Sequence, residues 1–380
     1  MIYLDYASTT PMSEKAIEAY TKTASLFFGN TNSLHDIGTG ANDVLTLCRR
    51  QFAHFINGDE KGVYFTSGGS EANYLAIRSL IKGSDASNRH IITTQIEHSS
   101  ILNLCGQLEE EGYTVTYLPV DKWGMISLSD LQKAVTSKTT LVSIQHANHE
   151  IGTIQPIQKI GRFLKEKNIL FHCDCVQSFG KLPIDVQLYG VDSLSVSSHK
   201  IYGPKGVGAV YIHPSVSWNS VYRNANHQSG FRPGTIDVPG VASFITAAQE
   251  AYSRIEEQRE LHEQLRTKWM TLMEPFKKFI TIEGHPSQRL PSVIGMTIDK
   301  IQGQYVMLQC NRHQIAISTG SACHAGLQHP SKTMTAIGKS NDEAKQFIRI
   351  SFGTNTSYND LKHLYTVLRK VMEEFHCVTM

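Results

Sequence analysis

Lys200 is the strongest candidate for covalent chemistry in this chain of 380 residues. It lies in the segment 197–206 (Ser-Ser-His-Lys-Ile-Tyr-Gly-Pro-Lys-Gly), after one run that predicts a β-strand and before another. A lysine in a loop at a strand end can reach into a cleft and form a Schiff base, and neighbouring hydroxyls could hold a phosphate. Taken alone, Lys200 is more simply explained as a surface lysine in a glycine-rich turn.

Asp174 follows the apolar run 169–172, which predicts another strand. Ligands of open α/β sheets bind at such strand ends, and a carboxylate there can keep a pyridine nitrogen protonated, so that the ring stores electrons. Strand alternation puts Cys173 and Cys175 on the opposite face, where we expect core packing. His172 with these two cysteines could also suggest a metal site, but the further ligands that zinc needs do not follow, so no metal is predicted.

The segment 66–73 (Thr-Ser-Gly-Gly-Ser-Glu-Ala-Asn) predicts a strand, a turn of small residues and a helix start. Backbone N–H groups at such a helix start can bind a phosphate, which makes Gly69 and Ser70 candidates; Ser70 could equally be only an N-cap. The segment lacks the order of a nucleotide-binding P-loop, and the glycines of 203–208 lie between strands. ATP and NAD are therefore not expected.

His98 ends another strand and opens a helix, so it could stack on an aromatic ring or move protons, although a lone histidine is more often structural. Its position matters more than its type. Five polar residues fall at the carboxyl ends of predicted strands, which places them on one edge of the sheet: Ser70, His98, Asn148, Asp174 and Lys200.

Cys323 lies in the segment 316–326, which follows an apolar strand with a run of small residues. Such a run predicts an accessible loop, where a neighbour can deprotonate a thiol that then carries a group between sites; the alternative is an exposed bystander. Arg349 alternates with apolar residues on a predicted strand. An arginine on a buried face needs a carboxylate, so it is either a substrate clamp or part of a core salt bridge.

Composition narrows the class of protein. Hydrophobic residues make up 41% and charged residues 18%, with a net charge of +2, which favours a soluble protein that does not bind nucleic acid nonspecifically. The seven cysteines are scattered without a framework, as in reduced cytosolic enzymes. The first residues show no secretory signal, so a cytoplasmic location is expected.

Helical and strand patterns alternate between residues 37 and 212, which predicts βαβ units around a mostly parallel sheet in an α/β fold. A long helical stretch follows residue 240 and continues towards 276. We expect a large domain over 13–250 and a smaller α+β domain from 1–12 and 251–380. Strands are predicted at 63–66, 91–93, 115–118, 141–144, 169–172, 194–196 and 208–212, and helices at 41–56, 71–81, 98–111, 128–135 and 157–167.

These segments together resemble the cysteine desulfurases of the NifS/IscS type, in the class V branch of the pyridoxal-phosphate enzymes. The resemblance covers nearly the whole chain and implies the aspartate-aminotransferase fold (fold type I). It is carried by the segments 3–7, 28–30, 66–73, 97–98, 148–152, 174–177, 197–206, 232–235 and 320–323, and by Arg349.

The resemblance implies a role for each matching residue. Lys200 would carry pyridoxal 5'-phosphate as a Schiff base, Asp174 would pair with the pyridine nitrogen, and His98 would stack on the ring. Gln177 would bond the ring hydroxyl, and His149, which replaces a family asparagine, is a further expected cofactor ligand. Asn148 and Arg349 would bind the substrate carboxylate. The phosphate would be held by Gly69, Ser70, Ser197 and His199, and by Thr235 of the partner subunit in a homodimer.

The implied reaction removes sulfur from L-cysteine, gives L-alanine and leaves a persulfide on Cys323. The persulfide would pass to an acceptor: an iron-sulfur scaffold, an iron-sulfur apoprotein or a tRNA-thiolation enzyme. His98 would carry a proton for the substrate thiol. The alternatives are a selenocysteine lyase, another lyase or an aminotransferase of the same fold, and a non-catalytic sulfur-carrier or scaffold subunit.

Overall fold

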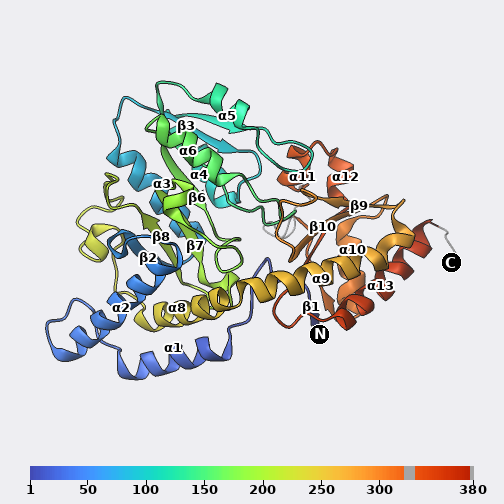
Figure 1. Ribbon diagram of the computed structural model, residues 1–380, viewed down its shortest axis with the longest axis horizontal. Helices are drawn as coiled ribbons and strands as arrows, with labels where there is room; N and C mark the ends of the chain where they lie inside the picture. Colours follow the sequence, from blue (N-terminus) through green and yellow to red (C-terminus); the bar gives the residue numbers. More distant parts are fainter. Residues whose placement is uncertain (321–329, 377–380) are drawn as a thin grey trace.

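A seven-stranded sheet forms the centre of the larger part of the protein (Figure 1). The computed structural model describes residues 1–320 and 330–376. The strand order is β2-β8-β7-β6-β5-β3-β4, and only β8 runs antiparallel to its neighbours. This confirms the predicted mostly parallel sheet. The strands are β2 (Val63–Thr66), β3 (His90–Thr94), β4 (Thr114–Leu118), β5 (Thr139–Ser143), β6 (Leu170–Asp174), β7 (Ser193–Ser197) and β8 (Gly208–Ile212).

Helices cover both faces of this sheet, as the crossover rule predicts. One face packs against α3 (Gly69–Gly83) and α4 (Ser99–Glu110), with Ile91, Leu141 and Val210 in the shared core. The other face packs against the remaining helices, with Phe171 and Leu194 in its core. Those helices are α2 (Asp36–Phe55), α5 (Leu128–Ala134), α6 (Ile157–Glu166), α7 (Val186–Tyr189) and α8 (Val238–Ser253).

The sequence did not predict α1 (Glu14–Leu26), which packs on α8 through a hydrogen bond from Ser243 Oγ to the Ala16 carbonyl. Several apolar residues of α1, among them Ile17 and Leu26, are exposed, so the helix lacks the clear apolar stripe that would reveal it. The predicted helical stretch from 240 towards 276 is present. It is two helices, α8 and α9 (Ile255–Met273), because the backbone leaves helical geometry at Arg254.

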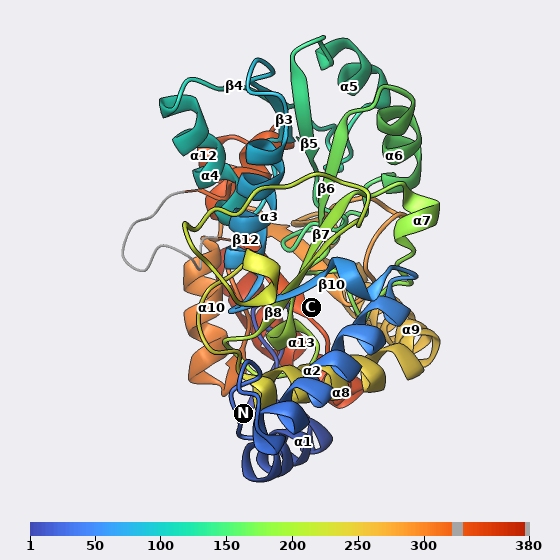
Figure 2. The ribbon, with the colours of Figure 1, turned by 90° about the vertical axis from the view of Figure 1, so that its left-hand side faces the viewer.

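A second region with its own core extends from α9 to α13 (Figures 1 and 2). Its antiparallel sheet has the order β12-β10-β9. The N-terminal strand β1 belongs to the same region, where it forms a separate two-stranded parallel sheet with β11. Among the described residues, no helix is long and apolar enough to cross a membrane. The elements are β1 (Ile2–Tyr3), β9 (Ile280–Glu283), β10 (Val293–Ile298), α10 (Gly303–Arg312), β11 (Ile315–Ala316), α11 (Lys332–Ala336), α12 (Asn341–Lys345), β12 (Phe347–Ser351) and α13 (Tyr358–His376).

Candidate active site

A cavity of about 360 Å³ lies at the carboxyl ends of β3, β5, β6 and β7. This is the edge at which ligands of open α/β sheets collect. The chain segment just before residue 321 also reaches it, through Ser318, Thr319 and Gly320. Ten residues proposed from the sequence line the cavity: Gly69, Ser70, His98, His149, Asp174, Gln177, Ser197, His199, Lys200 and Arg349.

The Asp174 carboxylate is fixed from two sides. Its Oδ2 accepts a hydrogen bond from Asn73 Nδ2 (2.8 Å), and its Oδ1 accepts one from the Val176 N–H (2.9 Å). Asn73 is itself buried on α3 and also contacts Ser100 and His172. The carboxylate is therefore held at the cavity wall in one orientation, as an electrostatic partner must be.

Lys200 closes the short 3₁₀ turn η2 (Ser198–Lys200) that follows β7. Its Nζ donates to the Ala7 and Ser8 carbonyls, both at 2.7 Å. Two residues later, Tyr202 has a positive φ of 68°, a conformation that side chains other than glycine seldom adopt. The Tyr202 N–H donates to Thr10 Oγ1, so the N-terminal segment holds this strained turn from outside.

Two histidine rings meet at the cavity wall, His98 and His149, with centroids 5.6 Å apart. Burial lowers the pKa of both, and that of His149 is also lowered by His98, Arg349 and Lys200. His98 Nδ1 accepts from the Ser100 N–H, so the neutral ring carries its proton on Nε2. At neutral pH these rings are uncharged, and His98 can donate through Nε2.

The start of α3 forms an anion cradle with the end of β7. The N-cap is Gly68, which offers no side chain to the helix N–H groups, and the adjoining hollow is lined by Ser70, Ser197 and His199. Ser197 Oγ is buried with no hydrogen-bond partner among the described residues. Burial and nearby lysines lower the pKa of His199 to about 4, which keeps this ring neutral. The alternative of Ser70 as N-cap is wrong because the helix begins at Gly69.

Close backbone approach explains the glycines of this cradle. A Cβ on Gly208 would lie 2.7 Å from the Gly68 Cα and 2.7 Å from the Val196 carbonyl oxygen. Separations below 3 Å are not tolerated without movement of the backbone. Small residues therefore let β8 pass directly beside the first turn of α3, as in other phosphate-binding turns.

Arg349 on β12 combines the two roles left open by the sequence. It forms a salt bridge with Asp5 (2.7 Å) and also donates to Ser8 Oγ and to the His149 carbonyl. Its side chain is only 6% exposed. Arg349 is thus anchored by a core ion pair, and its buried Nε is left without a partner among the described residues.

Asn148 does not reach the cavity, contrary to its predicted place in the substrate site. Its side chain is fully buried, and Oδ1 accepts from the N–H groups of Glu150 and Ile151. Its Nδ2 donates to the Ile96 carbonyl. The Asn148 side chain therefore stabilises the backbone turn at residues 148–151, and His149 lines the cavity instead.

Two further predicted residues stay outside the site of this single chain. Thr235 is exposed and does not line the cavity, so its proposed role in a partner's site stays a prediction. Cys323 lies outside the described residues.

Glu97 is buried next to the active-site cavity and contacts a residue that lines it. Its buried carboxyl accepts from Thr94 Oγ1 and from the Gln145 N–H, and Gln145 lines the cavity. Burial raises the pKa of Glu97 from 4.5 to about 8. The folded protein therefore keeps a proton that the unfolded chain loses above about pH 4.5.

The stability that this proton brings is fully present below pH 4.5 and is lost as the pH rises through 8. Glu97→Gln should remove this dependence, because the amide does not titrate. Between pH 5 and 8 the free energy of unfolding of the wild type should fall relative to the variant by about 3 to 4 kcal/mol, since one bound proton gives a slope of up to about 1.4 kcal/mol per pH unit. Chemical denaturation of both proteins across this range measures the difference, and parallel curves would contradict the prediction.

Asn73, Asp5 and Ser8 belong to the site but were not assigned a role from the sequence. The sequence could have indicated Asn73, because a polar residue on the buried face of an otherwise apolar helix needs a hydrogen-bond partner. Asp5 lies in the segment 3–7 that carries the family resemblance. No local pattern predicted the contacts of Asp5 and Ser8 with Arg349, which is 344 and 341 residues away in the chain.

The fold and the lysine-centred cavity define an enzyme of the class-V aminotransferase type, and the family model Aminotransferase class-V matches residues 2–364. The chain belongs to this family and, within it, to the group of the NifS and IscS cysteine desulfurases. It is 49% identical to the NifS protein of Bacillus subtilis (strain 168), over 97% of this chain and 94% of that protein. It is 36% identical to the cysteine desulfurase IscS of Methanosarcina thermophila, over 98% of this chain and 92% of that protein.

Solved structures agree with this assignment. A NifS-like protein superposes with a TM-score of 0.92 at 29% identity, covering 98% of this chain and 99% of that chain. A structure described as SspA in complex with cysteine superposes with a TM-score of 0.81 at 32% identity, covering 93% of this chain and 99% of that chain.

Proposed function

We propose that this chain is a cysteine desulfurase that converts L-cysteine to L-alanine and retains the sulfur as a persulfide on Cys323. The observation that carries the proposal is one cavity in which a lysine, a fixed carboxylate and an anchored arginine meet: Lys200, Asp174 and Arg349. Relatives named cysteine desulfurase match over nearly the whole length, and a structural neighbour was solved with cysteine.

Pyridoxal 5'-phosphate is the cofactor that these residues fit. The buried, unpartnered Ser197 hydroxyl and the uncapped start of α3 suit its phosphate, Asp174 suits its ring nitrogen, and Lys200 suits its aldehyde. We assign Gly69, Ser70 and His199 to the phosphate, and Gln177, His98 and His149 to the ring. When bound, the cofactor supplies an electron sink for the charge that develops at the substrate Cα.

The side chains of this protein would perform the remaining steps. Arg349 binds the substrate carboxylate through its Nε, and Lys200 moves the proton at Cα. His98, neutral because burial lowers its pKa, exchanges a proton with the substrate. The Cys323 thiolate attacks the substrate sulfur, so that an S–S bond forms while the Cβ–S bond breaks, and a proton on Cβ completes alanine.

Cys323 is favoured as the acceptor over the five cysteines of the described part of the chain, because these are buried. Burial raises the pKa of Cys48, Cys105 and Cys310 to about 12, which makes them poor nucleophiles. Gly320, three residues before Cys323, lines the cavity.

We further propose a cytoplasmic homodimer in which Thr235 of each subunit completes the partner's phosphate site. The persulfide then passes to a protein acceptor, as in iron-sulfur cluster assembly. Unpaired cysteines in the described part of the chain suit a reducing compartment.

The test is product analysis with purified protein, L-cysteine and a thiol reductant. Alanine and sulfide should appear in equal amounts. Pyruvate would indicate a β-lyase, consumption of an added 2-oxo acid would indicate an aminotransferase, and turnover of selenocysteine alone would indicate a selenocysteine lyase; each of these results would overturn the proposal. A protein that binds no cofactor would point to a non-catalytic subunit.

Ser197→Ala should weaken binding of pyridoxal 5'-phosphate about tenfold, because a hydrogen bond to a charged group is lost. The apoprotein should be no less stable, since the hydroxyl has no partner to lose. Ser198→Ala is the matched control: Ser198 Oγ is also buried without a partner among the described residues, but Ser198 does not line the cavity. Cofactor titration and thermal unfolding of both variants measure the two effects. Equal cofactor affinity in the two variants would contradict the assignment.

A further inference from the structure

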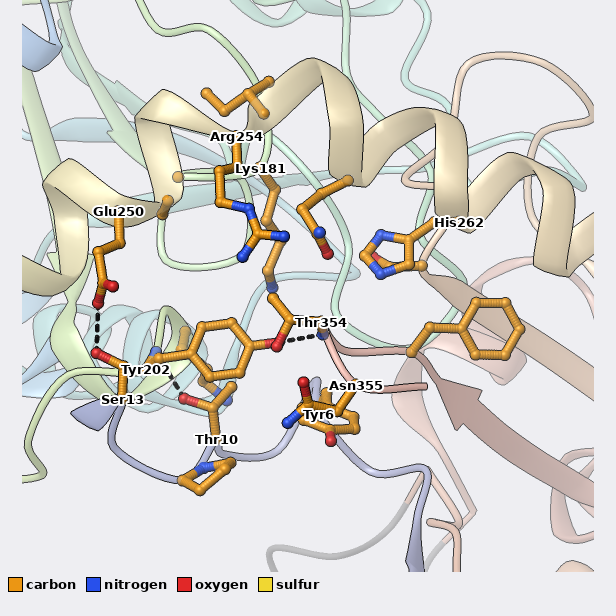
Figure 3. A pocket seen from close by; sticks show the side chains of 18 of the residues that line it. Tyr6, Thr10, Ser13, Lys181, Tyr202, Glu250, Arg254, His262, Thr354 and Asn355 are labelled. Atoms are coloured by element: carbon orange, nitrogen blue, oxygen red, sulfur yellow. Dashed lines mark hydrogen bonds between the residues drawn. The ribbon is translucent and has the colours of Figure 1, made fainter. Parts of the chain in front are cut away.

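A second and larger cavity, of about 620 Å³, has Lys200, Lys181 and Tyr202 among its lining residues. Figure 3 shows this cavity from close by. The N-terminal segment separates it from the active site: Ala7 and Ser8 line the active-site cavity, whereas Thr10 to Lys15 line this one. Lys200 lines both. The remaining walls come from the junction of α8 and α9 and from the second region, so the cavity lies between the two hydrophobic cores.

Gln258 on α9 leaves a complete amide unsatisfied at this cavity. Its Nε2 and Oε1 are both buried, and neither has a hydrogen-bond partner among the described residues. Buried polar groups without partners are uncommon and cost free energy, so each requires an explanation. A bound molecule that accepts from Nε2 would supply the missing partner.

Lys181 brings a positive charge to the same cavity without an acidic partner. Its Nζ contacts only a neutral group among the described residues, the Gln177 Oε1 at 3.4 Å. Burial, with Lys200 and Arg349 nearby, lowers the pKa of Lys181 to about 7. A buried ammonium group is stabilised by an anion, and none is paired with Lys181 in the described part of the chain.

The Glu250 carboxylate, which also lines the cavity, is engaged by other residues. Glu250 accepts from Ser13 Oγ and pairs with Lys15, whose side chain is 73% exposed. Figure 3 shows Glu250 and Ser13 together on one side, with Lys181 and Arg254 above the cavity and Tyr202 below it. Among the described residues, Lys181 Nζ and Gln258 Nε2 are thus donors at this cavity that have no acidic acceptor.

The apolar walls of the cavity indicate that the non-polar part of a ligand would bind there. Ile255, Leu290, Pro291 and Phe352 are apolar and line the cavity together with the ring of Tyr202. Cavities of this size, mostly apolar with a few convergent polar groups, are typical of small-molecule sites. We propose that this cavity is a second ligand site, which takes a small organic carboxylate with an apolar body and binds its carboxylate with Lys181 and Gln258.

The proposal does not depend on the activity proposed above and is tested by binding. Crystals of the holoenzyme soaked with 4-bromobenzoate should show anomalous bromine density in this cavity. In solution, calorimetry should give an affinity about tenfold higher for 4-bromobenzoate than for the neutral 4-bromobenzamide, because only the acid can pair with the ammonium.

Two variants and a control complete the test. Lys181→Met and Gln258→Leu should each weaken binding of 4-bromobenzoate, by about tenfold and several-fold respectively. Lys22→Met, on the exposed face of α1 and away from the cavity, should leave the affinity unchanged. Density in the active-site cavity only, binding at crystal concentration only, equal affinity for the amide, or unchanged binding in both cavity variants would each overturn the proposal.

Discussion

Lys200→Ala should reduce the rate of alanine formation from L-cysteine by at least about 10³-fold, while the protein stays folded. The lysine is proposed both to attach the cofactor covalently and to move the proton at Cα, and loss of general-base catalysis alone typically costs about 10²–10⁴-fold. The fold should survive because Lys200 belongs to neither hydrophobic core, and its Nζ donates to the Ala7 and Ser8 carbonyls at the cavity wall.

The Lys200→Arg variant distinguishes the positive charge of Lys200 from its proposed role as a base. Arginine keeps a cation that can donate to the same carbonyls, but its guanidinium does not lose a proton near neutral pH and cannot act as the base. The arginine variant should therefore be as inactive as the alanine variant and closer to wild type in thermal stability. Activity within tenfold of wild type in either variant would contradict the assignment of Lys200.

Cys323→Ser should abolish sulfur transfer to the protein and reduce alanine formation to background. A hydroxyl is far less nucleophilic than a thiolate near neutral pH, so the Cβ–S bond of the substrate has no acceptor for its sulfur. Cofactor binding should be unchanged, because Cys323 has no assigned part in holding it. Alanine formation assayed with reductant, together with cofactor absorbance, measures both effects.

Cys377→Ser is the matched control for this variant. Cys377 is the other cysteine outside the described residues, whereas the remaining five are buried. Its replacement should leave alanine formation within about twofold of wild type, because Cys377 has no assigned part in the reaction. If Cys377→Ser lost activity and Cys323→Ser kept it, the acceptor would be Cys377 and the assignment of Cys323 would be wrong.

The sequence predicted the residues that depend on strand ends. Parallel strands place their carboxyl ends on one edge, so Asp174 and Lys200 could be assigned to one cavity from local patterns alone. The same reasoning gave the wrong result for Asn148, because the backbone turn after β5 decides whether Asn148 or His149 faces the cavity. Asn148 uses its side chain to cap that turn, and His149 takes the position at the wall.

Residues that join the site from distant segments could not be predicted. Asp5 and Ser8 meet Arg349 only because β1 pairs with β11 and brings the N-terminus beside β12. The same packing brings the Ala7 and Ser8 carbonyls to Lys200 Nζ. Such contacts depend on how the two hydrophobic cores pack together. The hydrophobic pattern of a single helix or strand does not predict that packing.

The most direct test of the proposed function is mass spectrometry of the holoenzyme after one equivalent of L-cysteine has been added without reductant. The peptide that contains Cys323 should carry one additional sulfur atom, in an amount equal to the alanine released, and reductant should remove it. Alanine without sulfur on Cys323, or sulfur released together with pyruvate, would contradict the proposed transfer to Cys323.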